Sequence, residues 1–125
     1  IARRSDIEIY VVEDAAEISA LMPAEAIAVD CLLGTGATGE PRGLFGDAVR
    51  IANQSAAKRV AIDIPTGLDC DSGQPAETTF RADLTLTFVA RKFGFDNPAA
   101  QPFLGQVEVF GIGVPQTLLA RFGLA

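Results

Sequence analysis

Residues 26–31 read AIAVDC and residues 60–64 read VAIDI, two short apolar runs that each carry one aspartate. Their composition predicts a strand at each run. Between them, residues 42–57 place apolar side chains on one side of a helix of about four turns. This order of strand, helix and strand favours a parallel sheet with both faces covered, because uniformly apolar strands need helices to shield them from water.

The same alternation continues on both sides of this unit. The other predicted elements are strands at 7–12, 82–90 and 106–110 and helices at 15–22 and 116–122. Residues 65–81 carry two glycines and two prolines and predict a long irregular loop. A loop of that length in a small domain usually has a function. We therefore expect an α/β fold.

Composition limits the class of protein. The 125 residues fit one domain, and 49% of them are hydrophobic, which is enough apolar side chain to fill a core. The net charge is −6 and no basic run is present, so we expect no nucleic-acid partner. No apolar run reaches the roughly 18 residues of a membrane span. We expect a cytoplasmic protein without a membrane partner.

The scarcity of histidine and cysteine limits the chemistry. The sequence has no histidine and two cysteines, Cys31 and Cys70, which excludes a zinc cage of the usual ligand count and an imidazole base. Acid–base chemistry must then come from Asp, Glu, Lys or Tyr10. Two cysteines are too few for a disulfide framework, and we expect both to be reduced.

A glycine-rich loop follows the first of the two aspartates. After Asp30, residues 34–39 read GTGATG, which matches the pattern GxGxxG. Glycines let a ligand approach the backbone, and free N–H groups can hold a phosphate. Pro41 and Gly43 delay the helix, unlike an ordinary dinucleotide fingerprint. A phosphate cradle and a simple turn from strand to helix both remain open.

The acidic residues at the predicted strand ends are the other candidates. Asp63 lies in an apolar strand, where it is either functional or caps a neighbouring loop, because an unpartnered buried acid is costly. Asp30 and Thr66 offer the hard oxygens that an alkali or alkaline-earth ion prefers, and a simple hydrogen bond between two loops is the alternative. For Asp69 and Asp71, which flank a turn, we expect solvated side chains or side chains that form Asx turns.

Four stretches carry a resemblance to a known family. They are VDCLLGTGATGEPRG, VAIDIPTGLDCDSGQP, ADLTLTFVARKFGF and GQVEVFGIGVP, spread over residues 26–115. In this order they closely resemble the YjeF N-terminal domain family, the NAD(P)H-hydrate epimerases. The resemblance implies a three-layer Rossmann-like sandwich with a mostly parallel sheet, and a homodimer. It also implies interconversion of the R and S epimers of NADHX and NADPHX, so that a dehydratase domain or partner protein can restore the S form.

The resemblance further implies residue roles. It assigns Asp30 and Thr66 to a potassium ion and Asp63 to substrate binding. It assigns to the substrate's diphosphate region the loop of Gly34, Thr35, Gly36, Ala37, Thr38, Gly39 and Glu40. We expect Asp63 to be catalytic: it would stabilise the cation formed when hydroxide leaves the ring, and pass the proton between the leaving hydroxyl and incoming water. For Lys92 we expect a solvated side chain, and a side chain that faces the site is the alternative.

One part of the family pattern has no counterpart in this sequence. Family members carry an NNGGDG loop upstream, and residues 1–4 resemble the helix that follows it. We therefore expect residues 1–125 to be a single domain of this kind that lacks its N-terminal part. Two alternatives stay open: a non-catalytic relative that binds a nucleotide or a protein, and a generic dinucleotide-binding module, which the delayed helix disfavours.

Overall fold

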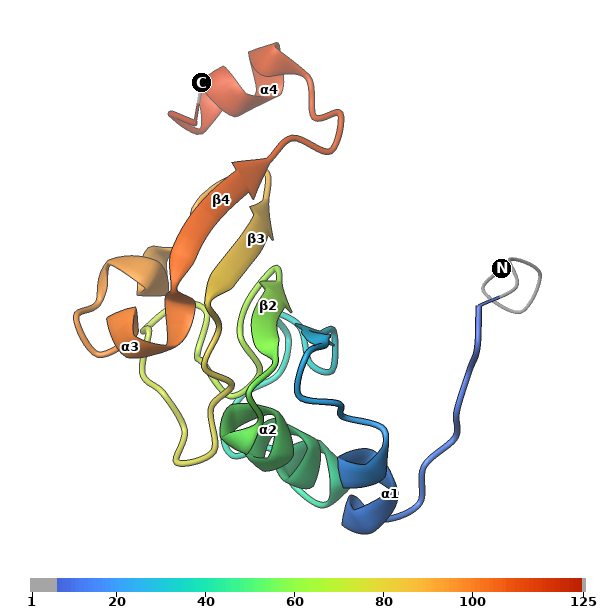
Figure 1. Cartoon of the computed structure of the whole chain (residues 1–125). Coiled ribbons are helices and arrows are strands. Elements are labelled where there is room, and N and C mark those ends of the chain that lie inside the picture. The colour runs from blue at the N-terminus through green and yellow to red at the C-terminus, as the bar shows by residue number, and fades with distance from the viewer. Residues whose placement is uncertain (1–6, 125) are drawn as a thin grey trace.

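The computed structural model describes residues 7–124, which form a parallel sheet with helices packed beside it (Figure 1). The helix expected at residues 1–4 lies outside the described residues. The strands are β1 (Ile27–Asp30), β2 (Lys58–Ile62), β3 (Leu84–Phe88) and β4 (Gln106–Phe110). All neighbouring strands are parallel, and their order in the sheet is β1-β2-β3-β4. This arrangement confirms the predicted α/β fold of the Rossmann-like class.

Three of the described helices agree with the predicted ones. They are α1 (Ala15–Ala20), α2 (Leu44–Gln54) and α4 (Gln116–Arg121). Two further short helices were not predicted: the 3-10 helix η2 (Phe93–Asp96) and α3 (Gln101–Leu104). Each has four residues, which is too short to show a helical period of apolar residues.

The core lies on one face of the sheet and has two parts. Under α2, Val49 and Ala52 pack with Ala61 of β2 and with Phe80. The second part joins the long loop to η2 and α3, and it contains Ile64, Leu68, Phe95, Ala100 and Leu104. The described residues thus supply the sheet and one covering layer.

The opposite face of the sheet is open at its edge strands. Ile27 and Val29 of β1 are exposed to 66% and 55%, and they alternate with the buried Ala28 and Asp30. This alternation is the period of two that a strand requires. It aims Asp30 at the covered side, where the loops after β1 and β2 gather.

The strand predicted at residues 7–12 is not formed. The segment has no regular secondary structure, and Ile7, Tyr10 and Val11 are exposed to 60%, 60% and 81%. In Figure 1 it runs away from the sheet beyond α1. A strand is stable only when a neighbour satisfies its backbone groups, and the segment pairs with no described strand. The strand prediction at residues 7–12 is therefore wrong, because it relied on the apolar pattern alone.

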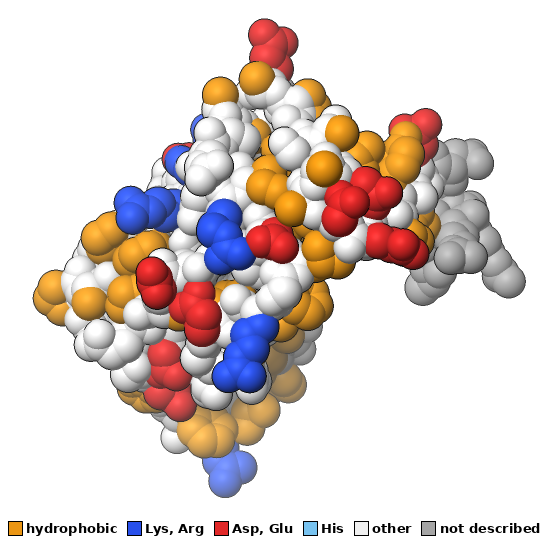
Figure 2. All heavy atoms as spheres, turned by 90° about the horizontal axis from the view of Figure 1, so that it is seen from below, with side chains coloured by type: hydrophobic (Ala, Val, Ile, Leu, Met, Phe, Trp, Pro, Cys, Tyr) orange, Lys and Arg blue, Asp and Glu red, His pale blue; other side chains and the backbone are white. Residues whose placement is uncertain are grey.

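The described helices are short, and the cysteines are free. The longest, α2, has 11 residues, and none between residues 7 and 124 could cross a membrane. Cys31 is exposed and Cys70 is half-buried, and both are free thiols. On the face shown in Figure 2, acidic and basic side chains are interspersed with apolar ones.

Candidate functional site

Two loops meet at the carboxyl ends of β1 and β2. Asp30 ends β1, and Thr66 lies four residues beyond the end of β2. Both are buried, with 4% and 1% of their surface exposed. Thr66 donates its hydroxyl to Asp30 Oδ1 over 2.8 Å and its backbone N–H to Asp30 Oδ2 over 2.7 Å. The hydrogen bond that the sequence left open as an alternative is therefore present.

The same two side chains hold the start of the glycine loop. The backbone N–H of Leu32 donates to Asp30 Oδ1 over 3.1 Å, and that of Leu33 donates to Thr66 Oγ1 over 3.2 Å. The bond from Leu32 to the Asp30 carboxylate is charge-assisted, which makes it stronger than a neutral one. Asp30 and Thr66 thus determine where the glycine loop leaves the sheet.

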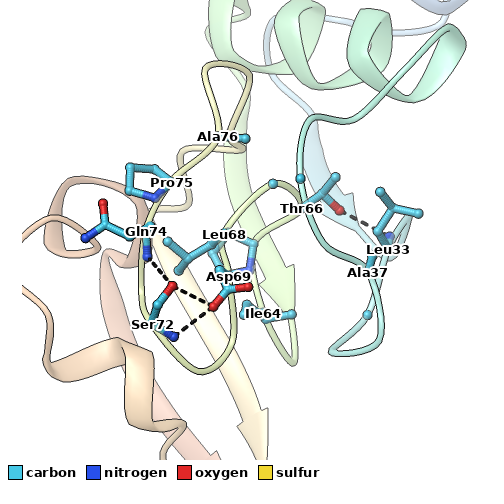
Figure 3. A pocket seen from close by; sticks show the side chains of 14 residues that line it. Leu33, Ala37, Ile64, Thr66, Leu68, Asp69, Ser72, Gln74, Pro75 and Ala76 are labelled. Atoms are coloured by element: carbon cyan, nitrogen blue, oxygen red, sulfur yellow. Dashed lines mark hydrogen bonds between the residues drawn. The ribbon is translucent and has the colours of Figure 1, made fainter.

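A cavity of about 250 Å³ lies between the glycine loop and the long loop after β2 (Figure 3). Leu33, Gly34, Ala37 and Gly39 line one side of it, and Thr66 reaches it from the other. Side chains added at Gly34, Gly36 or Gly39 would meet no atom within 4 Å. The glycine loop therefore presents bare backbone to open space, which allows a ligand to approach closely.

The remaining residues of the predicted diphosphate loop lie elsewhere. Thr35, Gly36, Thr38 and Glu40 are not among the residues that line this cavity. Glu40 accepts hydrogen bonds from the backbone N–H of Thr78, over 3.0 and 3.2 Å to its two carboxylate oxygens. Hydrogen bonding to the side chain and then to the backbone of Thr78 holds the pKa of Glu40 below its ordinary value. In this structure Glu40 ties the glycine loop to the long loop.

The long loop forms the other wall of the cavity. Asp69 Oδ1 accepts from the backbone N–H and the hydroxyl of Ser72, over 2.8 and 2.6 Å, and so stabilises a turn that reaches one residue further than the expected Asx turn. Asp69, Ser72 and Gln74 line the cavity, as Figure 3 shows. We did not single out Ser72 or Gln74 from the sequence, although the unusual length of this loop was a signal for it.

Asp63 is held by a separate set of contacts. It follows β2 directly and does not line the cavity between the loops. Its Oδ1 lies 2.8 Å from Lys92 Nζ and accepts from the Thr87 hydroxyl over 3.2 Å and from the Phe88 N–H over 3.4 Å. Asp63 therefore has partners on β3 and on the segment after it.

The environment of Asp63 favours its ionised form. Partial burial raises the pKa of Asp63, but the hydrogen bond and charge of Lys92, with the bonds from Phe88 and Thr87, bring the net pKa below the ordinary value. The expectation that Lys92 is solvated is wrong, since only 18% of its side chain is exposed. Its long stem reaches back to the end of β2, a contact that local sequence does not reveal.

The oxygens of Asp30 and Thr66 fit an alkali ion. After the hydrogen bonds above, Asp30 Oδ2 and Thr66 Oγ1 each keep one lone pair without a partner from residues 7–124. Carboxylate and hydroxyl oxygens are hard ligands. Within the same residues no group of three or more His, Cys, Asp or Glu side chains could hold a metal. The donor set therefore suits an ion of low charge better than a transition metal.

Comparisons with known proteins all point to one family. The family described as YjeF-related protein N-terminus matches residues 1–94. The chain is 51% identical over 124 residues to the NAD(P)H-hydrate epimerase of Rhodopirellula baltica. The matched segment covers 99% of this chain and 50% of that protein. It is 47% identical over 112 residues to the NAD(P)H-hydrate epimerase of Pirellula staleyi. This match covers 82% of this chain and 49% of that protein.

A longer relative also matches. The chain is 44% identical over 94 residues to the bifunctional NAD(P)H-hydrate repair enzyme Nnr of Pyrobaculum aerophilum, covering 75% of this chain and 19% of that protein. The chain thus spans about half the length of the two epimerases and a smaller part of the bifunctional enzyme.

Proposed function

Because this chain belongs to the family of YjeF-related protein N-termini, we propose that it acts in NAD(P)H-hydrate epimerisation, interconverting the R and S forms of NADHX and NADPHX. Its identity of 51% to a named epimerase, over nearly its whole length, supports the proposal. The observation that carries it is the contact of Asp30 with Thr66, which joins the glycine loop to the long loop around one cavity.

In this proposal the glycine loop receives the diphosphate of the substrate. The bare backbone at Gly34 and Gly39 lines the cavity, and no side chain would obstruct a phosphate there. Backbone N–H groups of such a loop are suitable donors to phosphate oxygens. The nicotinamide ring would then extend from the cavity towards Asp63, which is three residues before Thr66 in the chain.

The proposal includes a potassium ion held by Asp30 and Thr66. Asp30 Oδ2 and Thr66 Oγ1 have the lone pairs to contact it, and both atoms are buried. When bound, the ion would supply positive charge near the phosphates of the substrate. Asp30 and Thr66 position the loop through their own hydrogen bonds in addition to any role as ligands.

The reaction needs a group that stabilises positive charge on the ring. The hydroxyl of the hydrated nicotinamide sits on a carbon next to nitrogen, so the nitrogen lone pair can expel hydroxide and leave a delocalised cation. Asp63, ionised, would stabilise this cation electrostatically. Water then adds on the opposite face, and Asp63 takes the proton that this water releases. This proton and the departed hydroxide combine to one water molecule, so one water is consumed and one is released in each interconversion.

The proposed partners follow from the resemblance. We propose that a dehydratase, as a fused domain or as a separate protein, consumes the S epimer. The bifunctional name of relatives supports this, because it joins two activities in one chain. We also propose a homodimer, which light scattering of the purified protein would test through its molar mass.

The activity is tested with pure R-form NADHX. We expect the protein to convert it to an R and S mixture, faster with potassium than with an equal concentration of sodium, as followed by chromatography. Asp63→Asn should keep the fold and slow the conversion by orders of magnitude. Binding of NADHX without any interconversion would instead support the non-catalytic alternative.

A further inference from the structure

Two neighbouring strands end in the same unusual turn. Asp63 after β2 and Val89 after β3 both have a φ of 69°, and they are the non-glycine residues with positive φ in the described part of the chain. In each case a backbone N–H bonds to the carbonyl two residues earlier: Ile64 to Ile62 over 2.9 Å, and Ala90 to Phe88 over 2.8 Å. Such γ-turns are rare and strained, and Val89 is β-branched, which increases the cost.

Strain of this kind persists only where the surrounding structure enforces it, and it concentrates at functional sites. Here the two turns lie side by side. The N–H of Asp63 bonds to the Leu86 carbonyl over 2.7 Å, and the N–H of Val89 bonds to the Phe110 carbonyl over 2.9 Å. The turns are therefore attached to the neighbouring strands β3 and β4.

The turn at Val89 redirects the chain so that Lys92 comes back to the strand ends. Lys92 Nζ donates to the carbonyl oxygen of Phe88 over 3.1 Å and lies 2.8 Å from Asp63 Oδ1. Only 18% of the Lys92 side chain and 26% of the Asp63 side chain are exposed. A partly buried ion pair with additional hydrogen bonds holds both groups in one orientation.

The contacts of Asp63 are all on one oxygen. Lys92, Thr87 and the N–H of Phe88 bind Oδ1, and Oδ2 accepts no hydrogen bond within residues 7–124. A carboxylate held in this way by one oxygen keeps the other available to a ligand. The orientation of Oδ2 therefore depends on these three donors, of which Lys92 is the charged one and the one at the shortest distance.

The other charged groups nearby do not replace Lys92. The adjacent cation, Arg91, pairs with Asp96 over 3.1 Å. On the long loop, Cys70 is close enough to feel the charges of Asp63 and Lys92, as well as those of Asp69 and Asp71. Burial and the charge of Asp71 raise the pKa of the Cys70 thiol, so this group is neutral at pH 7. Lys92 is thus the cation that faces Asp63.

We propose that Lys92 is the positioning residue for Asp63: it holds Oδ1 so that Oδ2 faces the reacting ring and its water. This inference rests on the proposed epimerase function. It assigns Lys92 no contact with the substrate. The strained turns at Asp63 and Val89 are the structural means by which the two side chains meet.

The test compares three variants of the full protein. Lys92→Met should lower kcat for epimerisation by on the order of 100-fold with a much smaller change in KM, because Asp63 is misdirected while substrate binding persists. Lys92→Arg should restore a substantial part of kcat, since a cation returns to the same place. Lys58→Met, which removes the other lysine of the sequence at an exposed position, should leave kcat unchanged.

A second measurement does not depend on activity. The ¹³C signal of the Asp63 carboxyl carbon, assigned by its loss in Asp63→Asn, should titrate at higher pH in Lys92→Met than in the wild type or in Lys58→Met. An unchanged titration, or a wild-type kcat in Lys92→Met, would overturn the inference. If the wild type fails to epimerise, the proposed function is wrong, and the titration still decides whether Lys92 controls Asp63.

Discussion

The hydroxyl of Thr66 donates to Asp30 Oδ1 over 2.8 Å, although 36 residues separate the two in the chain. The parallel pairing of β1 with β2 makes this contact possible, because Asp30 aligns with Ala61 and both strands end at the same edge of the sheet. Each residue also holds a backbone N–H of the glycine loop. One buried pair therefore sets the positions of both loops around the cavity.

Thr66→Val should destabilise the protein by about 1–3 kcal/mol, because it leaves the Leu33 N–H and one lone pair of Asp30 without a partner in a buried place. Thr66→Ser keeps the hydroxyl and serves as the control. The measurement is chemical unfolding of both variants at pH 7. A Thr66→Val variant that is as stable as Thr66→Ser, or more stable, would contradict this role of the hydroxyl.

Gly67 and Gly36 should respond very differently to alanine. Gly67 has a φ of 92°, and a Cβ there would lie 2.4 Å from the Thr78 carbonyl oxygen. We expect Gly67→Ala to cost roughly 1–2 kcal/mol for the conformation, and about 1–3 kcal/mol more for the clash. Gly36→Ala meets no atom within 4 Å and should leave thermal stability nearly unchanged. Equal melting temperatures of the two variants would contradict this account of the long loop.

The strain at Val89 can be measured with a pair of substitutions. Val89→Gly and Val89→Ala both remove the isopropyl group, but only glycine adopts a φ of 69° without cost. We expect Val89→Gly to be the more stable by roughly 1 kcal/mol in urea unfolding. At Val109, in the regular strand β4, the order should reverse. An alanine variant more stable than the glycine variant at position 89, as expected at position 109, would mean that Val89 is unstrained.

The sequence predicted the elements that carry strong local patterns. The strand at 106–110 agrees with β4, and the strand at 26–31 and the helix at 42–57 agree with β1 and α2 except at their ends. The apolar run at 7–12 failed because strand formation depends on a neighbour, which a local pattern cannot specify.

The site was predictable to the extent that parallel strands share an edge. That rule placed Asp30 and Thr66 at the same edge of the sheet, since Asp30 lies near the end of one predicted strand and Thr66 follows another. The contact of Lys92 with Asp63 was not predicted, because Lys92 reaches Asp63 through a turn at Val89 that no glycine or proline indicates. Contacts that depend on backbone strain leave little trace in composition.

The stability contributed by Asp63 should depend on pH in a direction set by its lowered pKa. A carboxyl whose pKa is depressed by folding stabilises the protein above its unfolded pKa, about 3.9 for aspartate, and loses that contribution as the pH falls through the lower folded value. We therefore expect the wild type to exceed Asp63→Asn in stability at pH 7, with the difference shrinking progressively below about pH 4. Urea unfolding of both proteins from pH 7 to pH 3 measures this difference. Asp47→Asn, at an exposed ion pair with Arg50, is the control and should show a small difference at every pH. A difference between wild type and Asp63→Asn that grows as the pH falls would mean that Lys92 does not hold Asp63 as a carboxylate in the folded protein.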